Sequence, residues 1–97
     1  MKILVLNGSP HTNGATSDMV TAFASGATEA GHEVQIINVA HKSIRGCMAC
    51  EYCRMHEGAC VQKDDMQAIY PEILSADMVV FASPIYYFTL SAQLQAV

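Results

Sequence analysis

Residues 2–17, Lys-Ile-Leu-Val-Leu-Asn-Gly-Ser-Pro-His-Thr-Asn-Gly-Ala-Thr-Ser, decide the fold of this 97-residue chain. Residues 2–7 are an apolar run of the kind found in strands that are covered on both faces. Residues 8–14 are dense in glycine, proline and small polar side chains, which predicts a loop. From about residue 15 to residue 30, apolar side chains recur at helical spacing. A strand, a short loop and a helix therefore follow one another directly.

The same alternation continues along the chain. Residues 33–39 and 77–82 are two further apolar segments that predict buried strands, and residues 91–97 begin another helix. Short connections from strand to helix to strand favour parallel pairing with a right-handed crossover. We therefore predict a protein of the α/β class, with a parallel sheet between helices.

A further helix is expected to begin near Asp64. This aspartate stands three residues before Gln67. At that spacing the two side chains can form a capping box, in which each bonds the backbone N–H of the other. Pro71 falls within the same helix and should kink it, because proline lacks an N–H donor and clashes with the preceding turn.

The composition narrows the class of protein. Apolar residues make up 52% of the chain and charged residues 14%, and the formal net charge is −4, which argues against a nucleic-acid partner. Neither a signal-peptide pattern nor an apolar run of membrane-spanning length is found, so we expect a cytoplasmic protein without a membrane partner. A chain this short cannot bury so much apolar surface alone. We expect it to form a homo-oligomer, to be completed by another chain, or to belong to a longer polypeptide.

All the cysteines of the chain fall within one run of fourteen residues, and they are Cys47, Cys50, Cys53 and Cys60. Compact repeats of Cys-x-x-Cys are typical of iron–sulfur ligands, whereas zinc sites more often join two separated pairs. In a reducing compartment, a metal or redox role is expected before a disulfide. Ligation of a cluster is the favoured interpretation. Free or redox-active thiols, zinc and a disulfide are the alternatives.

Two loops offer a site for a phosphorylated aromatic ligand. Residues 8–17 lead into a helix N-terminus, where free N–H groups and the hydroxyls of Ser9, Thr16 and Ser17 can bind a phosphate. The loop lacks both the Walker A sequence and the glycine spacing of dinucleotide sites, so a mononucleotide such as FMN suits it better. Residues 83–88 can supply flat apolar walls for a flavin ring. In a flavodoxin-like strand order 2-1-3-4-5, the two loops flank the point where FMN lies. Taken singly, the first could be an ordinary turn and the second part of the core or of an interface.

Motifs along the whole chain carry a family resemblance. They are Asn7-Gly8-Ser9-Pro10, Asn13-Gly14, Thr16, the cysteine run, Lys63-Asp64-Asp65-Met66, Ala76-Asp77, Ser83-Pro84-Ile85-Tyr86-Tyr87 and Ser91-Ala92-Gln93-Leu94. In this order they resemble the flavodoxin-like NADPH-dependent FMN reductase family. Within that family, the iron–sulfur flavoprotein branch is the most similar.

The resemblance implies an FMN-dependent oxidoreductase, with NAD(P)H or a redox partner protein as the other electron carrier. The FMN contacts that it implies are Ser9, Pro10, His11, Asn13, Gly14, Thr16, Ser17, Ser83, Pro84, Ile85, Tyr86, Tyr87 and Phe88. It further implies that the four cysteines hold a 4Fe–4S cluster, which relays electrons to or from FMN. The family fold is a three-layer sandwich with a five-stranded sheet. We therefore expect residues 1–97 to be the N-terminal portion of one FMN-binding domain, truncated to strands 2-1-3, with a cysteine-rich loop at about 40–63.

Other functions stay open beside the cluster-containing oxidoreductase. The chain could be an NAD(P)H-dependent FMN or quinone reductase without a cluster, a non-catalytic electron carrier, or an inactive fragment. We find no serine–histidine–acid arrangement and no carboxylate pair at catalytic spacing. Any chemistry would therefore belong to the cofactor, which the protein binds and orients.

Overall fold

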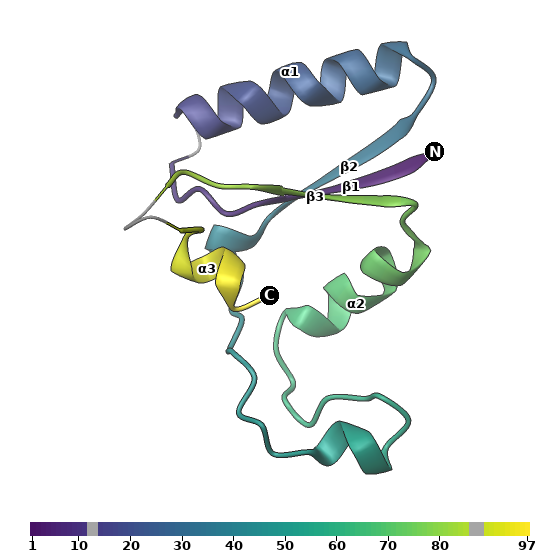
Figure 1. The fold of residues 1–97 in the computed structure, drawn as a ribbon, viewed down its shortest axis with the longest axis vertical. Coiled ribbons are helices and arrows are strands. Elements are labelled where there is room, and N and C mark those ends of the chain that lie inside the picture. Colours follow the sequence, from purple (N-terminus) through teal and green to yellow (C-terminus); the bar gives the residue numbers. More distant parts are fainter. Residues whose placement is uncertain (12–13, 86–88) are drawn as a thin grey trace.

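The computed structural model describes residues 1–11, 14–85 and 89–97. Its elements in chain order are β1 (Lys2–Asn7), α1 (Ala15–Glu29), β2 (Glu33–Asn38), the 3-10 turns η1 (Val39–His41) and η2 (Tyr52–Met55), α2 (Met66–Ser75), β3 (Met78–Ala82) and α3 (Ala92–Gln95). The strands form one parallel sheet in the order β2-β1-β3, with α1 on one face and α2 and α3 on the other (Figure 1). The predicted three-layer arrangement and strand order are confirmed. In these described ranges no helix has both the length and the apolar character needed to cross a membrane.

The sequence of β1 explains why helices cover both faces of the sheet. Side chains alternate between the two faces along a strand. Leu4 and Leu6 are fully buried in a cluster with residues of α2 and α3, whereas Ile3 and Val5 pack with Val20 of α1. Full burial of such a side chain stabilises the fold by about 1.5–3 kcal/mol. β1 is therefore the central strand of the sheet, and the sheet is the middle layer of the molecule.

The hydrogen bonds at the start of α2 differ from the expected capping box. One carboxylate oxygen of Asp64 accepts the N–H of Met66 at 3.0 Å. The Gln67 side-chain amide donates to the Gln62 carbonyl oxygen at 2.8 Å and does not return to Asp64. The capping box is therefore wrong, because Gln67 finds a partner in the preceding loop. Pro71 lies within α2 as predicted.

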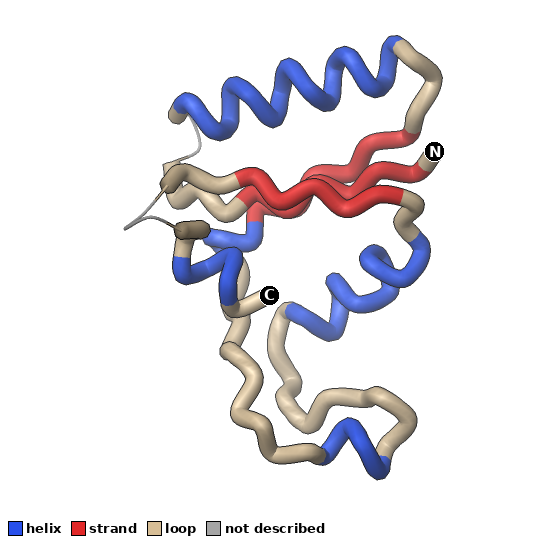
Figure 2. Tube along the Cα trace, in the orientation of Figure 1, coloured by secondary structure: helices blue, strands red, loops and turns tan. Residues whose placement is uncertain are grey.

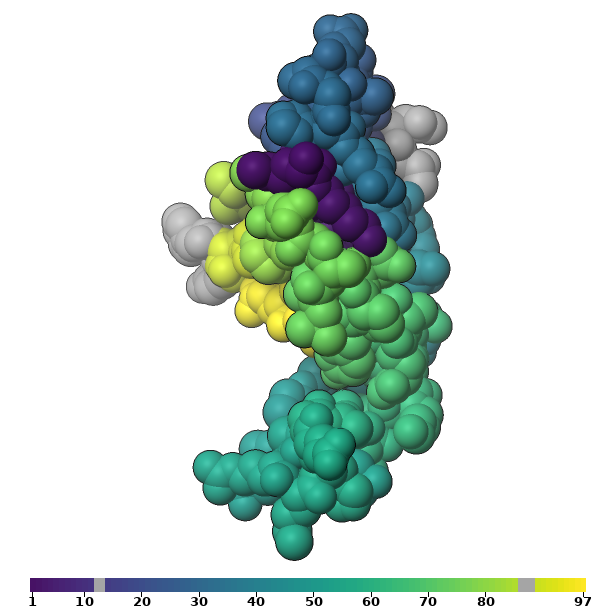
Figure 3. Space-filling model, turned by 90° about the vertical axis from the view of Figure 1, so that its right-hand side faces the viewer, coloured from purple at the N-terminus to yellow at the C-terminus, as the bar shows by residue number. Residues whose placement is uncertain are grey.

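Between η1 and α2 the chain forms a lobe that projects from the sheet. Figure 2 shows this segment as a mostly irregular trace with one short helical turn, and Figure 3 shows it in teal as a projection from the rest of the molecule. All residues from 45 to 59 are exposed. The long connection predicted over residues 40–63 is present, and it contributes little to the core.

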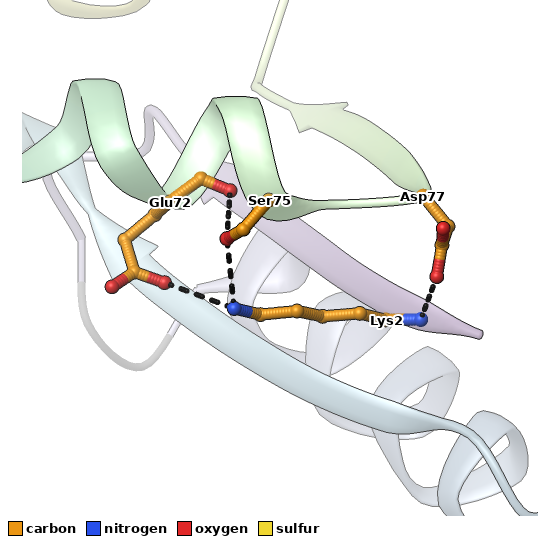
Figure 4. Close-up of polar contacts among 4 residues, drawn as sticks. All are labelled: Lys2, Glu72, Ser75 and Asp77. Carbon is orange, nitrogen blue, oxygen red and sulfur yellow. Dashed lines mark hydrogen bonds and ion pairs between the residues drawn. The ribbon is translucent and has the colours of Figure 1, made fainter.

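Contacts around Lys2 join the sheet to α2 at the end where β1 begins (Figure 4). The Lys2 N–H donates to the Asp77 carboxylate at 2.7 Å, and the Lys2 ammonium donates to the Ser75 hydroxyl at 2.9 Å. The ammonium also lies 3.6 Å from the Glu72 carboxylate. These contacts join the start of β1 to the last turn of α2 and to the connection between α2 and β3. The functional loops lie at the other end of the strands.

Candidate functional site

The carboxyl ends of β1 and β3 meet at one edge of the sheet, and the loops that follow them are joined there. The Gly8 N–H donates to the Ala82 carbonyl oxygen at 2.8 Å. Ser91 adds two contacts: its hydroxyl donates to the Gly8 carbonyl oxygen at 2.7 Å, and its N–H donates to the Ser83 hydroxyl at 2.9 Å. The structure therefore places the two predicted ligand loops side by side. Ser91 was not predicted as a site residue; in the sequence it was only the first residue of the last expected helix.

The loop after β1 closes on itself through its own polar groups. Ser9 is 5% exposed, and its N–H donates to the Asn7 side-chain oxygen at 3.0 Å. The Ser17 hydroxyl donates to the His11 carbonyl oxygen at 3.0 Å, and the His11 N–H donates to the Ser9 hydroxyl at 3.2 Å. The structure thus brings the hydroxyls of Ser9 and Ser17 to the backbone of His11.

The first turn of α1 presents backbone donors beside that loop. Gly14 is the N-cap residue, and no side-chain cap hydrogen bond forms there. The first N–H groups of an α-helix have no partners within the helix, so they are available to an anion. Pro10 and Thr16 are half-buried, and His11 is exposed. The predicted contact Asn13 lies outside the described residues.

A groove of about 310 Å³ lies between α1 and the carboxyl end of β3. Its lining is mostly apolar and includes Met19, Phe23 and Phe81. Among the described residues, Thr16 and Ser83 are the predicted site residues that line it. An apolar wall with a few polar groups suits a flat aromatic ligand.

The structure describes part of the loop after β3. The Ser83 hydroxyl donates to the Pro84 carbonyl oxygen at 2.8 Å while it accepts the N–H of Ser91. Ile85 is 81% exposed. Outside the described residues lie the aromatic side chains predicted to line the flavin ring, namely Tyr86, Tyr87 and Phe88.

The four cysteines line one pocket of about 230 Å³ between the lobe, α2 and the C-terminal residues. Cys47, Cys50 and Cys53 are exposed, and Cys60 is half-buried. In the part of the chain that the structure describes, no three cysteine, histidine or acidic side chains are arranged to hold a metal ion. The thiols face a common space without forming a coordination sphere, and the cluster stays a prediction.

Three residues of the lobe other than glycine have a left-handed backbone, and one N–H of the lobe contacts a cysteine sulfur. Ala49, Glu51 and Glu57 have positive φ angles of 56°, 64° and 55°, which cost about 1–2 kcal/mol each for residues other than glycine. Strained conformations of this kind cluster at functional sites. The Ala49 N–H also donates to Cys47 Sγ at 3.3 Å, and such contacts to sulfur tune iron–sulfur clusters. Four thiols facing one pocket are a donor set for iron–sulfur clusters or zinc.

Two further side chains face the cysteine pocket from α2 and its N-terminus. Burial raises the pKa of Tyr70, and the neighbouring Cys60 thiol raises it by a smaller amount. Asp64 accepts the N–H groups of Arg45 at 2.9 Å and Met66 at 3.0 Å, and these two bonds lower the pKa of its carboxyl. Neither residue was predicted to belong to the site. The pair of aspartates before a helix was the signal available in the sequence.

The chain resembles known proteins along its whole length. The model of the family described as NADPH-dependent FMN reductase matches residues 1–97. An iron–sulfur flavoprotein of Methanocaldococcus jannaschii is 34% identical over 95 residues, which cover 98% of this chain and 48% of the relative. One from Methanosarcina thermophila is 33% identical over 96 residues, covering 99% and 50%. The chain thus spans about half the length of these curated relatives.

Two solved structures share the fold. The NAD(P)H:quinone oxidoreductase from Methanothermobacter marburgensis has a TM-score of 0.79 at 23% identity, covering 99% of this chain and 50% of that one. RosB, solved with a bound 8-demethyl-8-formylriboflavin-5'-phosphate intermediate, has a TM-score of 0.79 at 20% identity, covering 99% and 40%. At these identities the likeness concerns the fold alone, and it confirms the flavodoxin-like architecture.

Proposed function

The chain belongs to the NADPH-dependent FMN reductase family, in its iron–sulfur flavoprotein branch, and from this premise we propose that it provides an FMN site and a cluster site to an oxidoreductase. The observation that carries the proposal is the junction between the β1 and β3 loops through Gly8 and Ala82. FMN in flavodoxin-like sheets binds at the carboxyl ends of such strands. When bound, FMN supplies hydride or single-electron chemistry.

The β1–α1 loop is assigned to the phosphate of FMN. The N–H groups in the first turn of α1 supply partial positive charge, and the hydroxyls of Ser9, Thr16 and Ser17 supply further donors. Ser9 and Ser17 already converge on the backbone of His11. A hydroxyl that now donates to a carbonyl can donate to a phosphate oxygen instead, and the charge of the phosphate makes the new bond stronger.

The cysteine pocket is assigned to the 4Fe–4S cluster. Cys47, Cys50, Cys53 and Cys60 would hold it, because all four line the same pocket and thiolates are its usual ligands. The cluster would supply one-electron chemistry, and the N–H of Ala49 would remain beside a ligand sulfur. For coordination, the thiols must draw together from their present positions.

The proposed electron donor is NAD(P)H or a redox partner protein, and the proposed location is the cytoplasm. Phe81 and Met78 on β3 are 59% and 42% exposed, and apolar residues on a strand edge favour pairing with another chain. This exposure supports a homo-oligomer or completion by another polypeptide.

A second candidate is an FMN or quinone reductase without a cluster. It needs only the FMN site, which the junction of the β1 and β3 loops supports without the cysteines. One solved structure with the same fold carries the name NAD(P)H:quinone oxidoreductase. A non-catalytic electron carrier would share the FMN site but would not turn over NAD(P)H.

An anaerobic absorption spectrum of the purified chain, with iron and flavin quantitation, tests these proposals. Bound FMN together with about four irons per chain would support the cluster-containing protein. FMN without iron would favour the second candidate. A chain that retains no flavin after incubation with excess FMN and removal of the unbound flavin would refute the FMN site. Steady oxidation of NADPH with an artificial acceptor would then distinguish an enzyme from a carrier.

A further inference from the structure

Two aspartates close the neck of the lobe that carries the cysteines. Asp65 and Ser43 pair reciprocally: the Asp65 N–H donates to the Ser43 carbonyl oxygen at 3.0 Å, and the Ser43 N–H donates to the Asp65 carboxylate. Beside them, the Arg45 N–H donates to the Asp64 carboxylate at 2.9 Å. The segments that enter and leave the lobe are therefore hydrogen-bonded to each other. We call this set of contacts the neck clasp.

One more hydrogen bond extends the neck clasp to the edge of the cysteine run. The Gln62 side-chain amide donates to the Gly46 carbonyl oxygen at 3.0 Å. Gly46 directly precedes Cys47, and Gln62 follows Cys60 by two positions. The first and last cysteines thus leave the neck from opposite segments. The separation of these two segments therefore influences how far apart the Cys47 and Cys60 thiols are before they bind a metal.

The neck is anchored to the core, whereas the lobe is not. Asp64 accepts the N–H of Met66 with its second carboxylate oxygen, at the start of α2. Met66 and Ile69 are 5% and 2% exposed and belong to the cluster that contains Leu4 and Leu6 of β1. Asp64 therefore connects the buried core to a loop whose residues 45–59 are exposed.

We propose that Asp64 and Asp65 are positioning residues that hold the cysteine loop closed before any metal binds. The inference rests on the proposed role of the cysteines as cluster ligands. Bringing the ends of a flexible segment together costs conformational entropy. A neck that is already closed leaves less entropy to lose when the thiolates converge. Carboxylates suit this role because each can accept two N–H bonds, and bonds to a charged acceptor are the stronger ones.

An anaerobic titration of the whole chain with Co²⁺ tests the neck clasp, because thiolate-to-cobalt charge-transfer absorption reports ligation by cysteine. Asp64→Ala removes both acceptor oxygens, whereas Asp64→Asn keeps one. We expect the Co²⁺ affinity to fall by about tenfold to a hundredfold in Asp64→Ala, and by a smaller factor in Asp64→Asn. Asp18→Asn, which alters an exposed carboxylate in the first turn of α1, is the matched control and should leave the affinity unchanged.

Amide hydrogen exchange in the metal-free chain is the second measurement. The neck clasp predicts that the N–H groups of Ser43 and Arg45 are protected without metal, and that Asp64→Ala releases Arg45. A residue that only stabilised the fold would change exchange throughout the sheet, including β1. Should Asp64→Ala fail to fold by far-UV circular dichroism, Asp64→Asn provides the same comparison.

The outcomes separate the neck clasp from the proposed cluster site. Equal Co²⁺ affinity in Asp64→Ala and in the unaltered chain would overturn the neck clasp and leave the cysteine site standing. Exchange of the Ser43 and Arg45 amides at unstructured rates would also overturn it. A chain without the charge-transfer band would refute the metal site, and protected neck amides in that chain would still support the closed neck.

Discussion

The hydroxyl of Ser91 donates a hydrogen bond of 2.7 Å to the carbonyl oxygen of Gly8, 83 positions earlier in the chain. The same hydroxyl accepts the N–H of Leu94 at 3.3 Å and so caps α3. Ser91 is 0% exposed. One buried side chain therefore stabilises both a helix N-terminus and the loop that we assign to the FMN phosphate.

Ser91→Ala should lower the free energy of unfolding by about 1–3 kcal/mol, because the Gly8 carbonyl and the Leu94 N–H would each lose a partner in a buried site. Urea unfolding measures this change. Gln93→Ala, at an exposed position in the same helix, should alter stability by less than about 0.5 kcal/mol. An equal loss of unfolding free energy in Ser91→Ala and Gln93→Ala would show that the buried hydroxyl stabilises the fold no more than an exposed side chain does.

Gly8 and Gly26 should respond in opposite directions to replacement by alanine. A Cβ atom at Gly8 would lie 2.6 Å from Ser91 Oγ and 2.7 Å from Leu94 Cβ, so Gly8→Ala should destabilise the fold by about 1–3 kcal/mol. A Cβ at Gly26 meets no atom within 4 Å, and the residue lies inside α1. Gly26→Ala should therefore stabilise by about 0.5–1 kcal/mol. Chemical denaturation of both variants tests the pair, and a stable Gly8→Ala variant would contradict the close packing.

The sheet could be predicted because β1 carries its own signal. Leu4 and Leu6 on one face and Ile3 and Val5 on the other make an unbroken apolar strand, which requires helices on both sides. Periodicity likewise located α1, since helical spacing is a local property of the sequence. The parallel pairing followed from the short connections, and the strand order from the family resemblance.

The contacts that shape the two candidate sites could not be predicted in the same way. The pair between Ser43 and Asp65 joins residues 22 positions apart through a side chain and the backbone, and no periodic pattern marks such a bond. The link between Ser91 and Gly8 depends equally on the folded arrangement. Local spacing placed the four cysteines together in the sequence, and the structure places all four on one pocket, but spacing alone could not show how the described thiols are arranged around it.

Acid should open the neck of the cysteine lobe. Backbone hydrogen bonds from Arg45 and Met66 lower the pKa of Asp64 from its usual value of 3.8, with a smaller contribution from the nearby Arg45 charge. Folding therefore favours the ionised carboxylate. The ionised Asp64 carboxylate therefore stabilises the folded neck above pH 3.8. This stabilisation is lost as the pH falls through the lower pKa that Asp64 has in the folded chain.

Nuclear magnetic resonance of the Arg45 amide in the metal-free chain would follow this transition. The resonance should keep its position down to about pH 4 and shift below that value. In Asp64→Asn the side chain carries no charge, so the shift should disappear. A midpoint above pH 3.8 in the unaltered chain would contradict the lowered pKa.

Ser17→Ala should weaken the binding of FMN and leave the binding of riboflavin unchanged. The two ligands differ by the phosphate, and a hydrogen bond to a charged group contributes about 1.5–3 kcal/mol, equivalent to a loss of about tenfold or more in FMN affinity. Quenching of flavin fluorescence on titration gives both dissociation constants. Thr21→Ala is a suitable control, because the Thr21 hydroxyl donates to the Ser17 carbonyl oxygen at 2.9 Å, one turn farther along α1. If Ser17→Ala weakened both ligands equally, the hydroxyl would support the loop and not the phosphate, and the assignment of this loop would have to rest on the amides of α1 alone.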